Sequence, residues 1–440
     1  MMAPVSRLRQ PLLGDSYRRI SLIPLYLATF MNGVSYCIAT FPAFGLRFRE
    51  LAVAEGWDAA QTAAALGRVT ATRRLLELLA TAMLARWSDK VGRRPVLLLC
   101  YAALCVEYVA LASSRSTWAL GWWHSAFGLF SNGNGTLETT CVADVMPSGD
   151  RRAMALGRLF AVLGVIMVVG PAIGGYLASI DGSAPFATAS MVSAGGVVYM
   201  GLSLPEYLTR RAARQGSSPC PSYAALIKTI RSNVSSSEWY ICASVFCSIG
   251  MGMSGSIQVL WLQEAFGWDS YAVGSFLSFS GLLLIVSQGF VLPVLLKRMD
   301  GSEALVAQIG LAITTARLAA FGLASSGISL YAAQLLSVAG NCSMAPMRSL
   351  CSRGVPSSQQ GSLMGIIAGL STMAQVVGSL LGSYVFSLSL HDGAPMGRAF
   401  FLAAAFNGCA TVCIAKGACI QSARPRVKSR DSSVPGEVCV

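Results

Sequence analysis

The amino-acid sequence predicts an all-α membrane protein in which twelve transmembrane helices form two similar halves of six. Of the 440 residues, 54% are hydrophobic and only 12% are charged, and the mean hydropathy is +0.58. A soluble domain carries about a quarter charged residues. Apolar runs of about 20 residues, each long enough to cross a bilayer, recur along the whole chain. The second half of the chain also repeats features of the first.

The apolar runs give the order of the predicted helices. They begin near Ser21, Thr62, Pro95, Thr117, Ala153, Ala184, Ser237, Tyr271, Glu303, Ile328, Ser358 and Met396. They lack the alternating pattern of about ten residues that is typical of strands in an outer-membrane barrel. We therefore expect an N-terminal segment at 1–20, six-helix halves at 21–205 and 237–420, a central loop at 206–236 and a tail at 421–440.

Basic residues collect on one side of the membrane in this topology. The segments before the first span, after the second, fourth, eighth and tenth, in the central loop and in the tail hold most of them. The other side has only Arg47, Arg49, Arg115 and Arg398. Because an excess of Lys and Arg marks the cytoplasmic side, we expect both termini in the cytoplasm. The net charge of +13 then reflects topology rather than nucleic-acid binding.

The sequence argues against an enzyme. It has two histidines, His124 and His391, and its thirteen cysteines form no C-x-x-C pair and no Cys/His cluster. We expect no metal and no cofactor. The stretch "RQPLLGD" near the N-terminus resembles a dileucine sorting signal, so the plasma membrane and an endosomal or vacuolar membrane both remain open.

The two halves share a repeated stretch. Residues 56–58, Gly-Trp-Asp, match residues 267–269, and Asp89 matches Asp300 in the same ungapped alignment. Parallel repeats of this kind place a substrate site near the membrane midplane between the halves. This organisation is typical of major facilitator transporters.

Two motifs carry a resemblance to that superfamily. "ARWSDKVGRRP" resembles its signature between spans 2 and 3, G-x-L-S-D-[RK]-x-G-R-[RK], with Ala85 in place of the first Gly. "LGVIMVVGPAIGGYL", residues 163–177, is similar to the fifth-span motif of proton-coupled drug antiporters, with Ile166 in place of its second Gly. The segments "VADVMPSGDRR", "LPE" and "RSLCSRGVPSSQQG" resemble the tetracycline-exporter and hippocampus-abundant-transcript branch.

The resemblance implies a role for each motif. The first is expected to be a gating loop that braces the cytoplasmic helix ends in one conformational state, through Asp89, Lys90, Gly92, Arg93 and Arg94. An alternative is that its basic residues only hold a short loop inside the cell. The second is expected to pack across the interface between the halves and limit leak, through Gly164, Gly170, Pro171, Gly174 and Gly175. Its glycines can also simply permit close helix packing.

Ionisable residues within the predicted spans are candidates for coupling. Such residues are expensive in a membrane and usually face a cavity or a partner. They are Arg73, Arg74 and Glu77 in span 2, Glu107 in span 3, and His124 and Glu138 in span 4. Arg73 and Arg74 can each reach Glu77 along one helical stripe, so a structural ion pair is an equal alternative. Either arginine could also face Glu138.

Glu138 is the acid that we expect to exchange protons. His124 and Glu138 fall on one face of an ideal helix, about 21 Å apart along its axis. Many relatives in this branch have an acid in span 1, where this chain has Asn32. Glu138, with Asp144, must then do that work if protons are coupled. In the second half we expect neutral cavity residues, Gln258 and Asn341 among them.

These features together predict a secondary active transporter that moves a small organic solute by alternating access, with proton-coupled export as the leading hypothesis. A facilitator or a proton symporter on the same fold is an alternative, and a transport-inactive sensor or scaffold is another. The expected partners are the solute, protons and the lipid bilayer. We expect a monomer.

Overall fold

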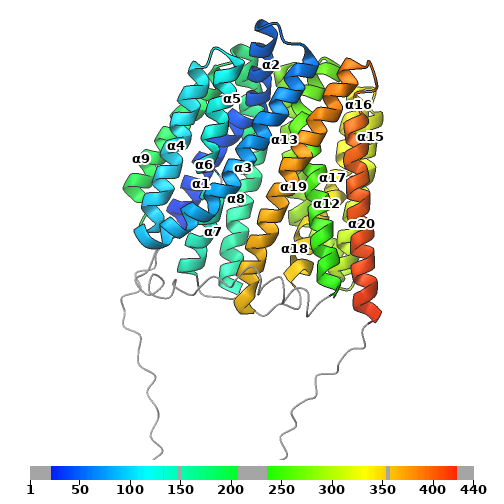
Figure 1. Cartoon of the computed structure of the whole chain (residues 1–440). Helices are drawn as coiled ribbons and strands as arrows, with labels where there is room; N and C mark the ends of the chain where they lie inside the picture. The colour runs from blue at the N-terminus through cyan, green and yellow to red at the C-terminus, as the bar shows by residue number, and fades with distance from the viewer. Residues whose placement is uncertain (1–20, 132, 147–149, 207–234, 353–356, 424–440) are drawn as a thin grey trace, which may run out of the picture. The chain divides into compact units, whose positions relative to one another are not determined.

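The computed structural model describes residues 21–423 except 132, 147–149, 207–234 and 353–356 (Figure 1). Over this part of the chain the secondary structure is helical and contains no strand. The predicted N-terminal segment, most of the predicted central loop and the predicted tail beyond residue 423 lie outside the described residues.

The first set of helices runs to residue 203. It consists of α1 (Ile23–Ile38), η1 (Ala39–Phe44), α2 (Gly45–Ala54), α3 (Ala59–Val91), α4 (Arg93–Ser113), α5 (Thr117–Ala126), α6 (Gly128–Ser131), α7 (Gly133–Val145), α8 (Asp150–Ile180) and α9 (Ala184–Ser203).

The second set begins at residue 235. It consists of α12 (Ser235–Phe266), α13 (Ser270–Val286), η2 (Ser287–Val291), α14 (Leu292–Arg298), α15 (Glu303–Leu323), α16 (Gly327–Leu335), α17 (Ser337–Gly340), η3 (Asn341–Ser343), α18 (Met344–Ser352), α19 (Ser357–His391) and α20 (Arg398–Ala423).

Nine stretches in the described residues are long and apolar enough to cross a membrane. They overlap nine of the twelve predicted spans. The span predicted near Thr62 is the long helix α3, which carries several charges. Those predicted near Thr117 and Ile328 are each divided into short helices, α5–α7 and α16–α18. The count of twelve therefore stays a prediction, whereas a multi-pass helical membrane protein is established.

Large apolar side chains on the surface fit a lipid environment. Trp118, Leu202 and Ile328 are 75%, 84% and 85% exposed. A soluble monomer rarely exposes apolar surface on this scale.

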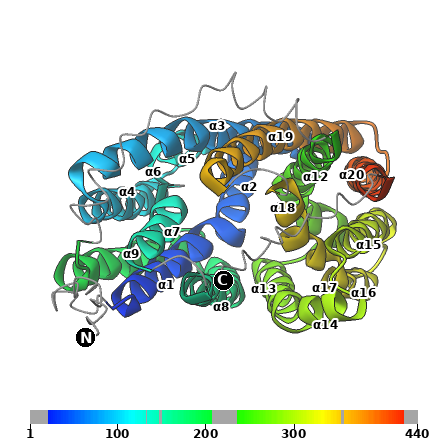
Figure 2. The same cartoon turned by 90° about the horizontal axis from the view of Figure 1, so that it is seen from below.

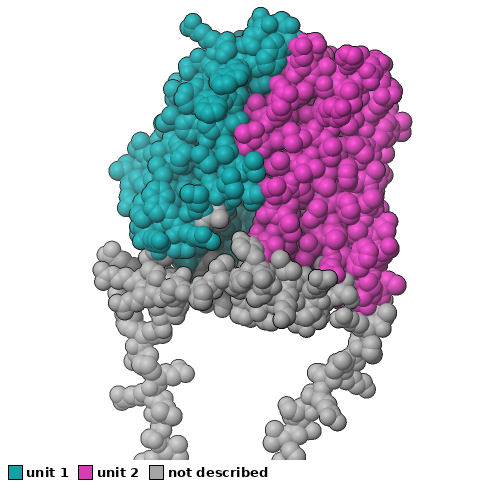
Figure 3. Space-filling model, in the orientation of Figure 1, with its two compact units in different colours: residues 1–57, 75–218, 268–282 teal, residues 58–74, 219–267, 283–440 magenta. Residues whose placement is uncertain are grey.

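The helices group into two compact units (Figure 3). Unit 1 contains residues 1–57, 75–218 and 268–282, and unit 2 contains residues 58–74, 219–267 and 283–440. The start of α3 therefore groups with the second set of helices, and most of α13 groups with the first. These units follow contacts rather than chain order, and the predicted boundaries of the halves stay a prediction.

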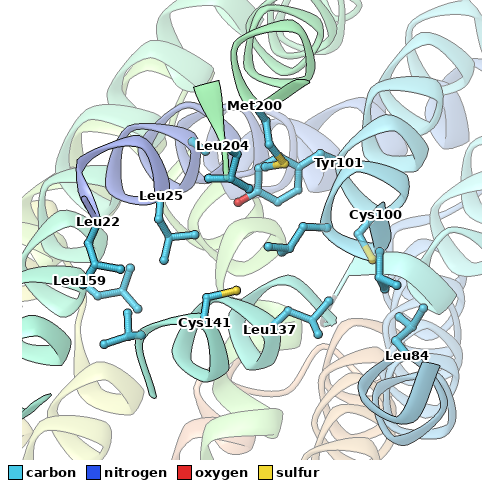
Figure 4. Close-up of a cluster of buried hydrophobic side chains, with 14 of the residues drawn as sticks. Leu22, Leu25, Leu84, Cys100, Tyr101, Leu137, Cys141, Leu159, Met200 and Leu204 are labelled. Atoms are coloured by element: carbon cyan, nitrogen blue, oxygen red, sulfur yellow. The ribbon is translucent and has the colours of Figure 1, made fainter. Parts of the chain in front are cut away.

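Unit 1 has an apolar core at the α4–α7–α9 side, where α1 also packs (Figure 2). Figure 4 shows this cluster, in which Leu25, Cys100, Tyr101, Leu137 and Cys141 are fully or almost fully buried. Since lipid tails are as apolar as these side chains, close packing rather than water exclusion stabilises such contacts in a membrane. Tyr101 brings a hydroxyl group into this core.

Glycine lets helices approach closely in both units. A Cβ atom on Gly170 or Gly174 of α8 would collide with α1, at Cys37 and at the carbonyl oxygen of Ile38. In unit 2, Gly378 and Gly382 of α19 lie in the same way against backbone carbonyls of α12. The two glycine pairs have the same spacing of four residues, so a close helix contact through two glycines is present in each unit.

Candidate functional site

The gating loop of the sequence motif is a tight turn between α3 and α4. Gly92 connects the two helices with φ +118°, a backbone conformation that strongly favours glycine. The carboxylate of Glu206, just after α9, accepts hydrogen bonds from the backbone N–H groups of Arg93 (2.9 Å) and Arg94 (3.2 Å). A carboxylate at this place stabilises the helix because free N–H groups and the helix dipole make the N-terminus positive.

Arg93 is the centre of a polar network at this end of unit 1. Its side chain is almost completely buried and forms ion pairs with Asp89 and with Asp144, the latter at 3.0 Å between Nε and Oδ2. It also donates to the Ser88 hydroxyl group. Asp144 therefore contacts Arg93 of the loop. The sequence suggests that Asp144 acts together with Glu138, and no contact between the two is seen in the described residues. Asp89 and Lys90 are exposed, and the Arg94 side chain donates to the Gly201 carbonyl oxygen.

The fifth-span motif lies on α8 and contacts two other helices of unit 1. Gly170 and Gly174 face α1, as described above. Gly175 faces α13, where a Cβ atom would lie 2.7 Å from the Gly274 Cα atom and 2.7 Å from the Ser270 carbonyl oxygen. Pro171 lies inside α8, and its carbonyl oxygen is the nearest atom to a Cβ built on Gly274. Gly164 is half-buried on the same helix.

Glu138 lies on α7 and is 5% exposed. Its Oε1 atom accepts a hydrogen bond from the Tyr101 hydroxyl group of α4. Within the described part of unit 1, no arginine or lysine forms an ion pair with it. The site is thus a carboxyl group that lies in the apolar core and accepts a hydrogen bond from a phenol.

Glu107 and His124 form a second buried pair. His124 Nδ1 lies 2.9 Å from Glu107 Oε1, between α5 and α4, and the two residues are 4% and 1% exposed. The imidazole also stacks on Phe44, with ring centroids 3.8 Å apart. His124 and Glu138 both contact α4, so the predicted common face of span 4 points towards that helix. The helix is interrupted between them at Phe127, so the distance calculated for one ideal helix does not apply along the whole span.

The remaining candidate residues are spread over other helices. Arg73 and Glu77 are buried on α3, and Arg74 is half-buried. Asn32 is buried on α1, and its side-chain Oδ1 atom has no hydrogen-bond partner. In unit 2, Gln258 and Asn341 are half-buried.

Three contact residues of this site are not among the candidates that the sequence gives. Tyr101, Phe44 and Glu206 are partners of Glu138, His124 and the α4 N-terminus. Glu206 lies in the quoted "LPE" segment, and an acid directly after a predicted span is its only signal. Tyr101 and Phe44 have no signal beyond aromatic character, because their partners are distant in sequence.

The fold and these motifs define an integral, multi-pass membrane transporter. A family model described as Major Facilitator Superfamily matches residues 21–379. The chain belongs to that superfamily, so it is a transporter and not an enzyme, and the resemblance seen in the sequence is confirmed.

Individual proteins agree with this assignment. The chain is 29% identical over 311 residues to the class D tetracycline resistance protein of Salmonella ordonez, covering 69% of this chain and 75% of that protein. It is 26% identical over 333 residues to human hippocampus abundant transcript-like protein 1, covering 73% and 63%. The crystal structure of the human organic anion transporter MFSD10 (TETRAN) has the same fold, with a TM-score of 0.62 and 20% identity over 91% of this chain and 100% of that one.

Proposed function

We propose that this protein exports a small organic solute across its membrane in exchange for protons, by alternating access. The observation that carries the proposal is Glu138, a buried carboxyl group with a phenolic partner and, among the described residues of its unit, no ion pair. Several relatives are named tetracycline resistance proteins, and a transporter that confers resistance to an organic compound would act by moving that compound out of the cell.

Glu138 can serve as a proton carrier because of its surroundings. An ionised carboxylate away from water and cations is unfavourable, and taking up a proton removes the charge. The Tyr101 hydroxyl group stabilises the ionised form by donating to it. Both protonation states are therefore accessible when the path to water alternates between the two sides. Asn32 cannot take this role, because an amide does not exchange a charge.

The α3–α4 loop supports the conformational part of the cycle. Arg93 links Asp89 at the end of α3 to Asp144 at the end of α7, and Glu206 ties the start of α4 to the end of α9. These contacts join four helix ends of one unit. We infer that they hold the ends together as a rigid body and that Asp89, which is exposed, adds a contact that forms in one state.

Replacing Glu138 with Gln tests the coupling role. The amide keeps the shape and can still accept from Tyr101, but it fixes a neutral side chain. In proteoliposomes, with a solute found by thermal-shift screening, we expect gradient-driven transport to be lost and downhill exchange to survive.

Two results would contradict the coupling role. Unchanged gradient-driven transport would remove Glu138 from coupling. If Glu138 instead neutralises Arg73 or Arg74, the variant leaves a buried cation unpaired, at about 3–5 kcal/mol. Thermal stability and both modes of transport would then fall together, and the melting temperature distinguishes this case.

Replacing Asp89 with Asn tests the gating role. We expect a folded protein whose transport is strongly reduced, since a charge needed in one state is missing. Arg86→Gln, which removes an exposed charge one turn earlier on the same helix, is the matched control and should retain transport. Equal transport by the two variants would refute the gating role of Asp89.

The alternatives differ in energy coupling and activity. The amide of Asn32 in span 1 favours a facilitator, which would transport downhill without a pH gradient in the wild type. A sensor would show no flux. From the distribution of basic residues we also infer that both termini are cytoplasmic and, from the fold, that one chain suffices for transport.

A further inference from the structure

A buried or half-buried polar pair lies at equivalent positions in the two sets of helices, between predicted spans 3 and 4 in the first set and between spans 9 and 10 in the second. In unit 1 the pair is Glu107 of α4 with His124 of α5, and in unit 2 it is Arg317 of α15 with Gln334 of α16. In each pair the members are 17 residues apart. The helices match as well, because α4 and α15 both have 21 residues and α5 and α16 both begin after a capping serine.

The charges of the two pairs are not equivalent. The Glu107 carboxylate faces an imidazole that can hold a proton, so the first pair can compensate its own charge. The Arg317 guanidinium donates to the neutral amide of Gln334, with 3.2 Å between Nη1 and Oε1. Its guanidinium also lies 5.1 Å from the centroid of the Phe321 ring. Among the described residues, no carboxylate forms an ion pair with Arg317.

This cation lies within the membrane-spanning part of unit 2. Arg317 precedes the last residue of α15, Leu323, by about 9 Å along the axis. A permanently charged guanidinium at such a depth is expensive without a counterion, and such residues in membrane proteins usually belong to a functional site. Phe321 beneath it packs on Trp261 and Phe400, so the guanidinium rests on a rigid aromatic cluster.

The donors around Arg317 are suited to an anion. One of the five N–H groups of the guanidinium donates to Gln334, which leaves a planar fork of the geometry that binds a carboxylate with two parallel hydrogen bonds. Gln334 accepts through its Oε1 atom, so its amide N–H groups can donate to the same ligand. The Arg317 side chain is half-buried, so part of it is not covered by protein, whereas Gln334 is 5% exposed.

We propose that Arg317 and Gln334 form an anion-binding subsite that recognises the carboxylate of the transported solute. This rests on the proposed transport of an organic solute and narrows it to organic acids or zwitterions. Binding of the solute supplies the counterion that the described residues do not provide. At the equivalent place the acid Glu107 has an imidazole partner that can be protonated, so a solute anion is not required there.

Benzoate and its neutral analogue benzamide test the proposal on the purified full-length protein in detergent, by thermal shift. We expect benzoate at about 10 mM, a concentration chosen to exceed the dissociation constant of a weak site, to raise the melting temperature by about 2 °C or more. Benzamide at the same concentration should raise the melting temperature much less. Arg317→Gln keeps an amide for Gln334 and should lose the difference between the two ligands. Arg317→Lys keeps the charge without the fork and should retain part of it.

Lys416→Gln is the matched control. Lys416 is also a cation over an aromatic ring in unit 2, 5.0 Å from the Trp239 centroid, but it is exposed. This variant should respond to benzoate like the wild type. The thermal-shift assay needs neither a proton gradient nor transport. A response to benzoate would therefore support the subsite even if transport proves not to be proton-coupled. Conversely, proton-coupled transport of a neutral solute with no response to benzoate would refute the subsite alone.

Several results would overturn the proposal. One is an equal benzoate shift in the wild type and Arg317→Gln; another is the absence of any benzoate shift. Sodium chloride or added phosphatidylglycerol giving the full shift, with none further from benzoate, would assign the site to a halide or a lipid headgroup instead. If Arg317→Gln does not fold, Arg317→Lys decides, because a response equal to that of the wild type would exclude the bidentate fork.

Discussion

Replacing Gly175 with Ala is expected to destabilise the contact between α8 and α13. The added Cβ atom would lie 2.7 Å from the Cα atom of Gly274 and 2.7 Å from the carbonyl oxygen of Ser270. Both neighbours are backbone atoms, so neither can rotate away. The contact can only be relieved by moving one helix relative to the other.

The required movement sets the size of the effect. Ordinary contacts of a Cβ atom begin at 3.4 Å, so the helices must separate by roughly 0.7 Å at this point. Inserting a methyl group into a well-packed contact destabilises a protein by about 1–3 kcal/mol. Alanine also gains about 0.5–1 kcal/mol in helix propensity over glycine, which partly offsets the loss.

Gly157→Ala is the matched control because it lies on the same helix. Gly157 is exposed, and no atom lies within 4 Å of the position that an added Cβ atom would take. The gain in propensity is common to both variants, so the difference between their free energies of unfolding isolates the clash. We expect Gly175→Ala to be less stable than Gly157→Ala by about 1–3 kcal/mol, measured by thermal and denaturant unfolding in micelles.

Equal stability of the two alanine variants would refute the close approach of α8 and α13. A second consequence allows an independent check. If the contact limits leak, as the family resemblance implies, proteoliposomes with Gly175→Ala should lose a proton gradient faster than those with Gly157→Ala.

Two further predictions concern the α3–α4 loop. Gly92→Ala should destabilise the protein by about 1–3 kcal/mol, because φ is +118° and the Cβ atom would lie 2.6 Å from Glu206 Oε2; a melting temperature equal to that of the wild type would contradict this. Asp144→Asn should lower the free energy of unfolding by about 1–3 kcal/mol, because it removes one of the carboxylates that pair with the nearly buried Arg93. If Asp144→Asn causes the same loss in an Arg93→Gln background, the ion pair is not the cause.

Features with a local cause can be predicted from the sequence. The membrane class follows from composition, and the turn at Gly92 follows from a motif in which a glycine separates two helices. The glycines of span 5 are likewise expected at helix contacts. Each of these depends on residues that are close in the chain, or on a property summed over many residues.

Partners across helices cannot be predicted in the same way. The sequence suggests a cavity or an arginine as the neighbour of Glu138, and its contact in unit 1 is instead the phenol of Tyr101. His124 and Glu107 are separate candidates in the sequence, and the structure brings the two together. A single helical period says which residues share a face, but it does not say which neighbouring helix that face meets. Span 4 is also interrupted at Phe127, between His124 and Glu138.

The repeated glycine contacts of α8 on α1 and of α19 on α12 bear on how this chain can be altered. The close contacts at Gly170, Gly174, Gly378 and Gly382 leave no space for a side chain, so glycine is required at these places in both units. The polar pairs at the equivalent places differ in kind, because one contains the acid Glu107 and the other the base Arg317. Close helix packing is therefore common to the two units, whereas the charge carried beside it differs between them, so a property that depends on charge need not be shared by the two units.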